Sequence, residues 1–215
     1  MGRRALRRND ADLDLSGHLA DAEQFPDGWS PGDLFPSPAP LEIEVGSGKG
    51  LFLETVSGEH PDRNYLGIEI ARKYARFAAS RIARCQRTNA VVVAGDAMLL
   101  FQRRLVTESV QAVHVYFPDP WWKKRHRKRR VMNSSFLEQV ARVLQPGGEF
   151  HFWTDVLEYY QGAQQLLDEI PQLEGPFPVE PREAEHDMDY RTHFERRVCL
   201  KDEPVYRSRF VRTAG

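Results

Sequence analysis

Residues 41–56 read LEIEVGSGKGLFLETV, and this stretch decides the fold class. Leu41–Val45 is a short β-prone run that ends in glycines at positions 46, 48 and 50, and Leu51–Val56 then reads as a helix. The glycines let the backbone turn sharply and lie against a ligand without a Cβ clash. No serine or threonine follows Lys49, so the loop is not a GxxxxGK[ST] phosphate loop. The stretch predicts a strand, a ligand-binding turn and a helix.

The same alternation continues downstream. Further strands are predicted at Tyr65–Ile70, Val91–Ala94, Ala112–Phe117 and Glu149–Thr154, and helices at Arg72–Arg84, Met98–Leu105, Phe136–Leu144 and Leu157–Ile170. Two last β-prone stretches, Phe194–Leu200 and Val205–Val211, are predicted to form a hairpin. Alternation of this kind predicts an α/β fold with a mostly parallel sheet and helices on both faces. Ligands in such sheets bind outside the carboxyl ends of the strands.

The composition of the chain and its N-terminal segment indicate its domain organisation and the kind of protein it is. Residues 1–40 hold five prolines between Pro26 and Pro40, and we expect them to form a flexible N-terminal extension to a single domain over residues 41–215. The sequence has no apolar run long enough for a membrane span and no secretory signal. Its two cysteines, Cys85 and Cys199, form no CxxC motif. We expect a cytoplasmic protein without a metal site.

Positive charge is concentrated in one place. Residues 117–130 read FPDPWWKKRHRKRR, and seven of the last eight are lysine or arginine, whereas the whole chain has 30 Lys+Arg against 31 Asp+Glu. Such a patch attracts polyphosphate, and flat rings beside it can stack on bases. A solvated loop or a localisation signal is the alternative. The run follows a predicted strand and a Pro-Asp-Pro turn, which favours a functional site.

Acidic residues follow three of the predicted strands or lie in them. Glu69 lies 19 residues beyond Gly50, the spacing of an acid that binds both hydroxyls of a ribose, although it could instead cap the next helix. Asp96 could accept from an adenine amino group or act as a helix N-cap. With no phosphate-binding cation between them, these acids favour S-adenosylmethionine over NAD. Glu44 would then lie near the methionine ammonium or the sulfonium.

Together these residues resemble the tRNA (guanine-N7-)-methyltransferase family, from Leu41 to about Arg212. The segments that carry the resemblance are the Glu44–Gly50 loop, residues 67–69, Asp96, residues 117–121 with the basic run, residues 154–155 and residues 192–195. The resemblance implies a Rossmann-like class I methyltransferase domain with a seven-stranded sheet and a C-terminal antiparallel hairpin. It also implies methyl transfer from S-adenosylmethionine to N7 of the variable-loop guanine, position 46, of tRNA.

The resemblance also assigns residues by position. The cofactor set is Glu44, Gly46, Gly48, Glu69, Asp96 and Asp119, and Asp119 is in addition the catalytic residue. The substrate set is Lys123, Asp155, Thr192, His193, Phe194 and Glu195. The RNA-contacting stretch is Arg125, His126, Arg127, Lys128, Arg129 and Arg130. Two positions depart from the family pattern: Trp122 stands where a second proline is usual, and His193 where lysine or arginine is usual.

Local sequence gives several of these residues an alternative role. Asp119 could be an ordinary turn residue, and Asp155 could be the N-cap of the next helix. Thr192 and Glu195, without the resemblance, read as polar residues at the edge of a strand. Trp121 and Trp122 could stack on an extruded base or pack in the core. His114 and His151 alternate with apolar residues in predicted strands, which favours structural roles for both.

Two other classes of function remain open at this point. An NAD-dependent oxidoreductase could use the glycine loop, but Asp96 would then have no evident task. A non-catalytic RNA-binding module could keep the sheet as a scaffold, although the four acids at positions 44, 69, 96 and 119 argue for a working cofactor pocket. The sequence does not distinguish a monomer from a homodimer.

Overall fold

The computed structural model describes residues 13–179 and 192–214, apart from the side chains of Lys124, Arg127 and His193. The strands are β1 Leu19–Asp21, β2 Leu41–Val45, β3 Asn64–Glu69, β4 Ala90–Ala94, β5 Val110–Tyr116, β6 Leu144–Thr154, β7 Leu173–Phe177 and β8 Tyr206–Arg212. The helices are α1 Leu51–Glu59, α2 Arg72–Arg84, α3 Ala97–Leu99, α4 Ser134–Val143, α5 Leu157–Asp168 and α6 His193–Cys199. The 3-10 helices are η1 Ala22–Gln24, η2 Pro31–Leu34 and η4 Lys124–Arg129, and η3 Leu100–Arg104 is a π-helix.

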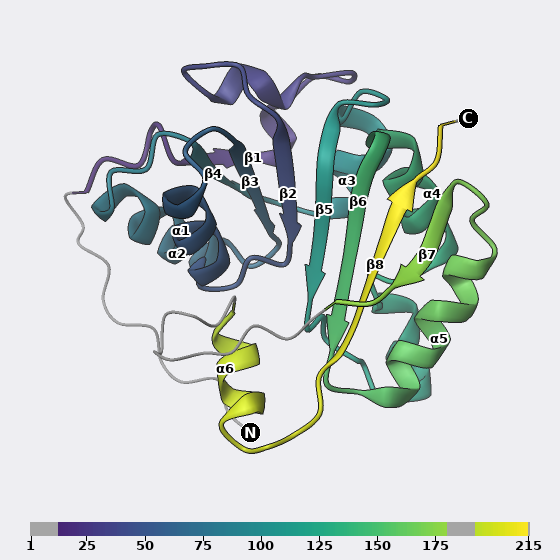
Figure 1. Cartoon of the computed structure of the whole chain (residues 1–215). Coiled ribbons are helices and arrows are strands. Elements are labelled where there is room, and N and C mark those ends of the chain that lie inside the picture. The colour runs from purple at the N-terminus through teal and green to yellow at the C-terminus, as the bar shows by residue number, and fades with distance from the viewer. Residues whose placement is uncertain (1–12, 180–191, 215) are drawn as a thin grey trace.

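The strands form one sheet in the order β1-β4-β3-β2-β5-β6-β8-β7 (Figure 1). The first six strands in this order are parallel, and β8 is antiparallel to both β6 and β7. The predicted α/β fold, with a mostly parallel sheet and antiparallel C-terminal strands, is therefore confirmed. The strand order reverses between β2 and β5, and such a reversal leaves a crevice for a ligand at the carboxyl ends of the strands.

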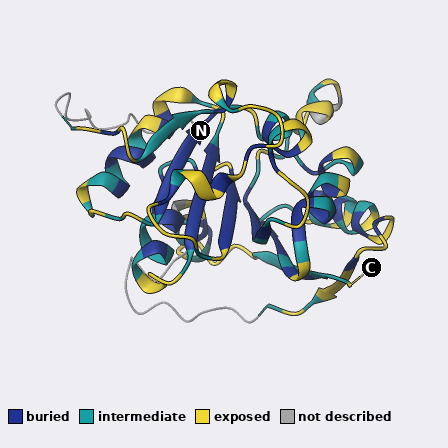
Figure 2. Cartoon of the chain, turned by 90° about the horizontal axis from the view of Figure 1, so that it is seen from above, coloured by how far each residue is buried: buried dark blue, intermediate teal, exposed yellow. Residues whose placement is uncertain are grey.

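Helices cover both faces of the sheet. On one face α1 and α2 pack on β3 and β4 through a cluster that includes Phe52, Tyr65 and Ile82. On the other face η3, α4 and α5 pack through a larger cluster that includes Phe101, Phe136 and Phe152. Figure 2 shows the strands of the sheet as the buried layer and the outer sides of the helices as exposed. No helix among the described residues is long and apolar enough to cross a membrane.

The prediction of a strand at Phe194–Leu200 is wrong. Residues 193–199 form helix α6, which lies beyond the carboxyl ends of β2 and β5 (Figure 1). Strand β8, which was predicted at Val205–Val211, is present but pairs with β6 and β7 instead of with that segment. Thr192 starts the helix by accepting a hydrogen bond at Oγ1 from the backbone nitrogen of Glu195 at 2.9 Å.

The expectation that residues 1–40 lack packed elements is wrong for the part of this segment that the structure describes. Strand β1 pairs in parallel with β4 and adds an eighth strand to the expected seven. Ala22, Trp29 and Phe35 are buried in the larger core cluster. A Cβ at Gly95, which follows β4, would lie 2.3 Å from the Cβ of Ala22. The N-terminal segment is thus packed directly against the loop that carries Asp96.

The two edges of the sheet differ from its centre. Strand β1 has only three residues, and β7 contains Pro176, which has no backbone N–H to donate. Towards the β7 edge, the sheet face on the α1 side carries polar side chains, among them Glu149 and His151 of β6 and Arg209 of β8. The described helices leave this part of the sheet face partly uncovered, so polar side chains can lie on it.

Candidate active site

The loop after β2 is shaped by glycines with left-handed backbone angles. The φ angles of Gly46, Gly48 and Gly50 are 85°, 54° and 71°, a region that other residues rarely adopt. A Cβ at Gly50 would lie 2.7 Å from the Cβ of Ala78 in α2, so this glycine is also required for close packing. A Cβ at Gly46 would meet nothing within 4 Å. The start of the loop therefore faces open space, as a ligand-binding turn should.

Glu69, at the end of β3, is joined to this loop. Its Oε2 accepts a hydrogen bond from the backbone nitrogen of Gly48 at 2.9 Å, and its Oε1 accepts from the backbone nitrogen of Ala71 at 2.9 Å. Glu69 is not the N-cap of α2: that position is Ala71, without a side-chain capping bond, and in this turn Glu69 bonds only to the backbone nitrogen of Ala71. The bond to Gly48 places the carboxylate beside the glycine loop, and the ribose-binding role of Glu69 stays a prediction.

Glu44 is a buried carboxyl group with an unsatisfied oxygen. The residue is 4% exposed, and its Oε2 has no hydrogen-bond partner among the described residues. Its pKa is raised to about 8: burial and the charge of Glu69 raise it, and these outweigh a hydrogen bond from Ser47 that lowers it. Buried polar atoms are nearly always paired, so this oxygen marks a place for a donor that the described residues do not supply.

Asp96 has the cap that the sequence allowed as an alternative. Its Oδ1 accepts from the backbone nitrogen of Met98 at 2.9 Å and so caps α3. The side chain is exposed at the carboxyl end of β4. Because one carboxylate has four acceptor sites, the cap leaves acceptor capacity for a ligand at the same group. The N-cap role is observed, and the adenine role stays a prediction.

The turn with Asp119 is strained on both sides. Phe117 and Trp121 have φ angles of 48° and 44°, which cost about 1–3 kcal/mol each for residues of this size. The backbone nitrogen of Phe117 donates to the backbone oxygen of Trp153 at 2.8 Å, and Nε of Arg130 donates to the oxygen of Pro120 at 2.7 Å. These bonds hold Asp119 on an exposed turn between β5 and the basic stretch.

Tyr159 of α5 lies near this turn. Burial raises the pKa of Tyr159 to about 12; a backbone hydrogen bond at Met132 and the charge of Arg130 lower it, and the charge of Asp119 raises it. The guanidinium of Arg130 lies over the Tyr159 ring, 4.6 Å from its centroid. The end of the basic stretch is therefore anchored on Tyr159 of α5. The charge of Asp119 also acts on the hydroxyl of Tyr159.

The basic stretch is presented to solvent. Lys123, Arg125, Lys128 and Arg129 are exposed, whereas His126 and Arg130 are partly buried. Trp122 is 63% exposed, so core packing is not its role. Trp121 is half-buried and contacts His126 edge-on, and the guanidinium of Arg129 lies 5.2 Å from its centroid. Trp121 thus supports the stretch, and Trp122 is the ring available to a partner.

Asp155 is not the N-cap of α5. The cap position is Val156, which makes no side-chain capping bond, and Oγ1 of Thr154 accepts from the nitrogen of Val156 at 3.2 Å. The alternative reading of Asp155 is therefore wrong. The side chain is half-buried at the carboxyl end of β6, next to the strand that carries the Asp119 turn.

Residues 192–195 form the first turn of α6 and not a strand edge. Glu195 is 7% exposed, and Nη2 of Arg207 in β8 donates to its Oε1 at 3.0 Å. Phe194 is 36% exposed and stacks on Phe117 at 5.1 Å between ring centroids. The predicted substrate segment is thereby attached to the Asp119 turn through an aromatic contact. The side chain of His193 lies outside the described part of the structure.

The carboxyl ends of β2, β3, β4, β5 and β6 bring most of the predicted residues to one end of the sheet, where α6 also lies (Figure 1). A hollow of about 370 Å³ lies elsewhere. Residues from the start of β2, from the end of α1 and from the polar sheet face line it, and they include Glu42, Arg63, His114 and His151. No group of three or more potential metal ligands occurs among the described residues.

Comparison with known proteins decides the family. A family model described as "Putative methyltransferase" matches residues 38–208. A tRNA (guanine-N(7)-)-methyltransferase of Rhodopirellula baltica is 51% identical over 213 residues, which cover 96% of this chain and 79% of that protein. This chain belongs to the tRNA (guanine-N(7)-)-methyltransferase family. The enzyme of that name from Myxococcus xanthus is 34% identical over 180 residues, which cover 81% of this chain and 84% of that protein.

Solved structures agree on the fold of this methyltransferase family member. A SAM-dependent O-methyltransferase from Thermotoga maritima superposes with a TM-score of 0.54 at 15% identity, over 83% of this chain and 61% of that chain. The aminoglycoside resistance methyltransferase NpmB1 superposes with a TM-score of 0.53 at 19% identity, over 81% of this chain and 87% of that chain. At these identities the likeness concerns the fold alone, and it confirms the expected methyltransferase architecture.

Proposed function

We propose that this chain transfers a methyl group from S-adenosylmethionine to N7 of guanine in tRNA, and that the target is the variable-loop guanine at position 46. One arrangement carries the proposal beyond family membership. An acid-bearing turn, residues 117–119, runs directly into an exposed basic stretch at the same end of the sheet as the glycine loop. A donor pocket and a polyanion-binding surface then adjoin. The family match leaves the dinucleotide oxidoreductase alternative without support.

The residues at the crevice fit S-adenosylmethionine. The unpaired Oε2 of Glu44 is a buried acceptor that suits the ammonium of a methionine moiety. Gly46 leaves open space at the loop, and Glu69 lies beside Gly48 in the position of a ribose-binding acid. Asp96 is exposed one strand further along, where an adenine amino group would lie. None of these positions carries a cation suited to a pyrophosphate.

The chemistry requires alignment more than proton transfer. S-adenosylmethionine supplies a methyl group on a sulfonium, and N7 of guanine has a free lone pair that needs no deprotonation before attack. The chain therefore has to position the base and stabilise charge. Asp119 is the group we assign to this task, because a carboxylate at the turn favours positive charge on the purine and can accept from N1–H or the amino group. Asp155 and the first turn of α6 supply further polar contacts.

The basic stretch would hold the tRNA backbone. Exposed arginine and lysine side chains neutralise phosphates without reading sequence, so they position the RNA and do not choose the base. Trp122, exposed beside them, can stack on an unpaired base. Choice of the target then depends on the residues of the Asp119 turn and of α6, which are joined by the stacking of Phe117 on Phe194.

A methylation assay tests this function directly. The full chain is incubated with S-adenosylmethionine and tRNA that lacks N7-methylguanosine, and the products are digested and mapped by mass spectrometry. We expect one N7-methylguanosine in the variable loop. Modification of a different base, or no modification of any tRNA by a chain that binds S-adenosylmethionine, would refute the assignment. The second result would favour a non-catalytic RNA-binding protein.

A further inference from the structure

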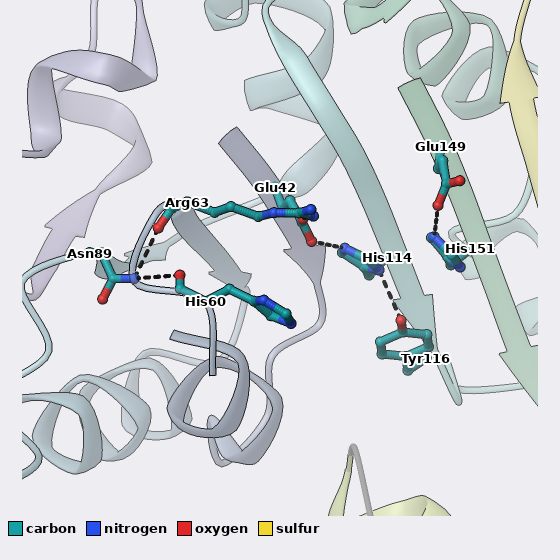
Figure 3. A network of polar contacts seen from close by, with 8 residues as sticks. All are labelled: Glu42, His60, Arg63, Asn89, His114, Tyr116, Glu149 and His151. Atoms are coloured by element: carbon teal, nitrogen blue, oxygen red, sulfur yellow. Dashed lines mark hydrogen bonds and ion pairs between the residues drawn. The ribbon is translucent and has the colours of Figure 1, made fainter. Parts of the chain in front are cut away.

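A buried chain of hydrogen bonds runs along the sheet behind the active site. Nη1 of Arg63 donates to Oε1 of Glu42 at 2.5 Å, Oε2 of Glu42 lies 2.8 Å from Nε2 of His114, and Nδ1 of His114 lies 2.9 Å from the hydroxyl of Tyr116 (Figure 3). Glu42, His114 and Tyr116 are all less than 9% exposed. None of them belongs to the cofactor or substrate sets. We call these four residues the relay.

The direction of each bond in the relay follows from the charge on Glu42. Burial alone would raise the pKa of Glu42, but the bonds from His114 and Arg63 outweigh burial and lower it to about 2. An ionised carboxylate can only accept, so Nε2 of His114 carries the proton and donates. In the neutral ring Nδ1 is then an acceptor, and the hydroxyl of Tyr116 donates to it. For a neutral His114 ring, the relay therefore fixes both the tautomer and the direction of the Tyr116 hydroxyl.

Tyr116 is the last residue of β5, and its ring is held on two sides. Phe52, in the first turn of α1 after the glycine loop, contacts it edge-on at 5.2 Å between centroids. Trp153 of β6 contacts it at 4.6 Å. The next residue, Phe117, has the left-handed φ angle of 48° and begins the turn that carries Asp119. A strained turn persists only where its flanks are fixed, and Tyr116 is one of these flanks.

The same ring system reaches the substrate segment. The guanidinium of Arg207 lies over the ring of Trp153, 4.9 Å from its centroid, and Nη2 of Arg207 donates to Glu195 in α6. Phe194, next to Glu195, stacks on Phe117. Tyr116 thus adjoins elements that lead to the glycine loop, to the Asp119 turn and to α6.

We propose that His114 and Tyr116 are positioning residues for methyl transfer, which hold the end of β5 so that the Asp119 turn and α6 keep their productive geometry. This inference rests on the proposed function. It assigns no contact with the substrate to either residue. The bond between Nδ1 of His114 and the Tyr116 hydroxyl is the element that the proposal needs, since the ring of Tyr116 would stay packed without it.

Tyr116→Phe removes this bond and keeps the ring. We expect kcat for tRNA methylation to fall roughly ten- to a hundred-fold, since small misplacement of reacting groups is costly. The dissociation constant for S-adenosylmethionine should change less than about two-fold, because the cofactor acids are untouched. Tyr160→Phe is the matched control: it removes a hydroxyl that bonds to the backbone oxygen of Arg207 on the other face, and we expect wild-type kcat.

Nitrogen NMR of histidine-labelled protein supplies a readout without substrate. We expect His114 as the neutral tautomer with the proton on Nε2, and a shift of its Nδ1 resonance in Tyr116→Phe but not in Tyr160→Phe. A proton on Nδ1 of His114, or a Tyr116→Phe enzyme with kcat within two-fold of wild type, would overturn the inference. An equal fall in kcat in Tyr160→Phe would also overturn the inference. If wild-type protein methylates no tRNA, the proposed function fails first.

Discussion

The carboxylate of Glu69 holds the glycine loop by accepting a hydrogen bond from the backbone nitrogen of Gly48 at 2.9 Å. Glu69 ends β3, and Gly48 lies in the loop that follows the neighbouring strand β2; the register of the two strands pairs Val45 with Ile68. A side chain from one strand thereby fixes the backbone that follows the other. Glu69, which we expect to bind ribose, therefore also holds the shape of the glycine loop beside it.

Glu69→Ala should weaken S-adenosylmethionine binding at least ten-fold, or about 1.4 kcal/mol. The substitution removes a ribose acceptor and also frees the backbone nitrogens of Gly48 and Ala71. Titration calorimetry measures the effect, and Glu69→Gln, which keeps one acceptor oxygen, should lie between. Glu174→Gln, on the exposed strand β7, is the control. A dissociation constant for Glu69→Ala equal to that of the control would exclude Glu69 from the cofactor site.

Asp119→Ala should leave the fold and the affinity for S-adenosylmethionine largely intact while kcat falls at least a hundred-fold, the usual scale for losing one group that stabilises charge in the transition state. Asp119→Asn separates charge from shape, because the amide can still accept but carries no charge. We expect it to be nearly as inactive as Asp119→Ala. Single-turnover methylation rates provide the comparison. Turnover near wild type in either variant would remove Asp119 from the chemistry.

Binding of tRNA should depend steeply on salt, whereas binding of S-adenosylmethionine should not. Each phosphate that a cation neutralises releases condensed counterions, so the logarithm of tRNA affinity falls with the logarithm of salt concentration. The triple variant Arg125→Ala, Lys128→Ala, Arg129→Ala should lower this slope by roughly one for each phosphate that is no longer neutralised. Filter binding at several salt concentrations measures the slope. An unchanged slope in the triple variant would place the RNA surface elsewhere.

The buried Glu44 should make stability depend on pH. Its pKa in the folded chain is raised from 4.5 to about 8, so between these values the folded state holds a proton that the unfolded state has released. Its contribution is therefore present at low pH and is lost as the pH rises through about 8. Glu44→Gln should flatten this decline by up to about 1.4 kcal/mol per pH unit. Urea unfolding at about pH 5 and about pH 8 provides the test, and an equal decline in wild type and variant would refute the burial effect.

The parts of the fold that local pattern determines were predictable. Helix α2 begins and ends at Arg72 and Arg84 as predicted, because its apolar residues repeat at helical spacing. The sequence predicts a strand in place of α6 because Phe194, Val198 and Leu200 are separated by even numbers of residues, which fits one face of a strand as well as it fits a helix. The signal that could have found it is the pair Thr192 and Glu195, which has the spacing of a capping box.

The pairing of strands that lie far apart in the sequence could not be predicted from local pattern. Strand β1 has three residues and is a strand only because β4 offers it an edge, so no periodicity marks it. For the site, the spacing of Glu69 from Gly50 indicated the acid beside the loop, but only coordinates show its bond to Gly48. His114 and Glu42 look like isolated polar residues in strands, and their pairing depends on the register of β2 with β5.

The two edge strands of the sheet, β1 and β7, have a consequence for handling the protein at high concentration. Open strand edges recruit other chains by backbone hydrogen bonding, and this is a common route to aggregation. Here a three-residue strand closes one side, and a strand interrupted by Pro176 closes the other. Neither offers a long run of free N–H and C=O groups. Growth of the sheet from molecule to molecule is thereby discouraged, which favours concentrated samples that stay dispersed.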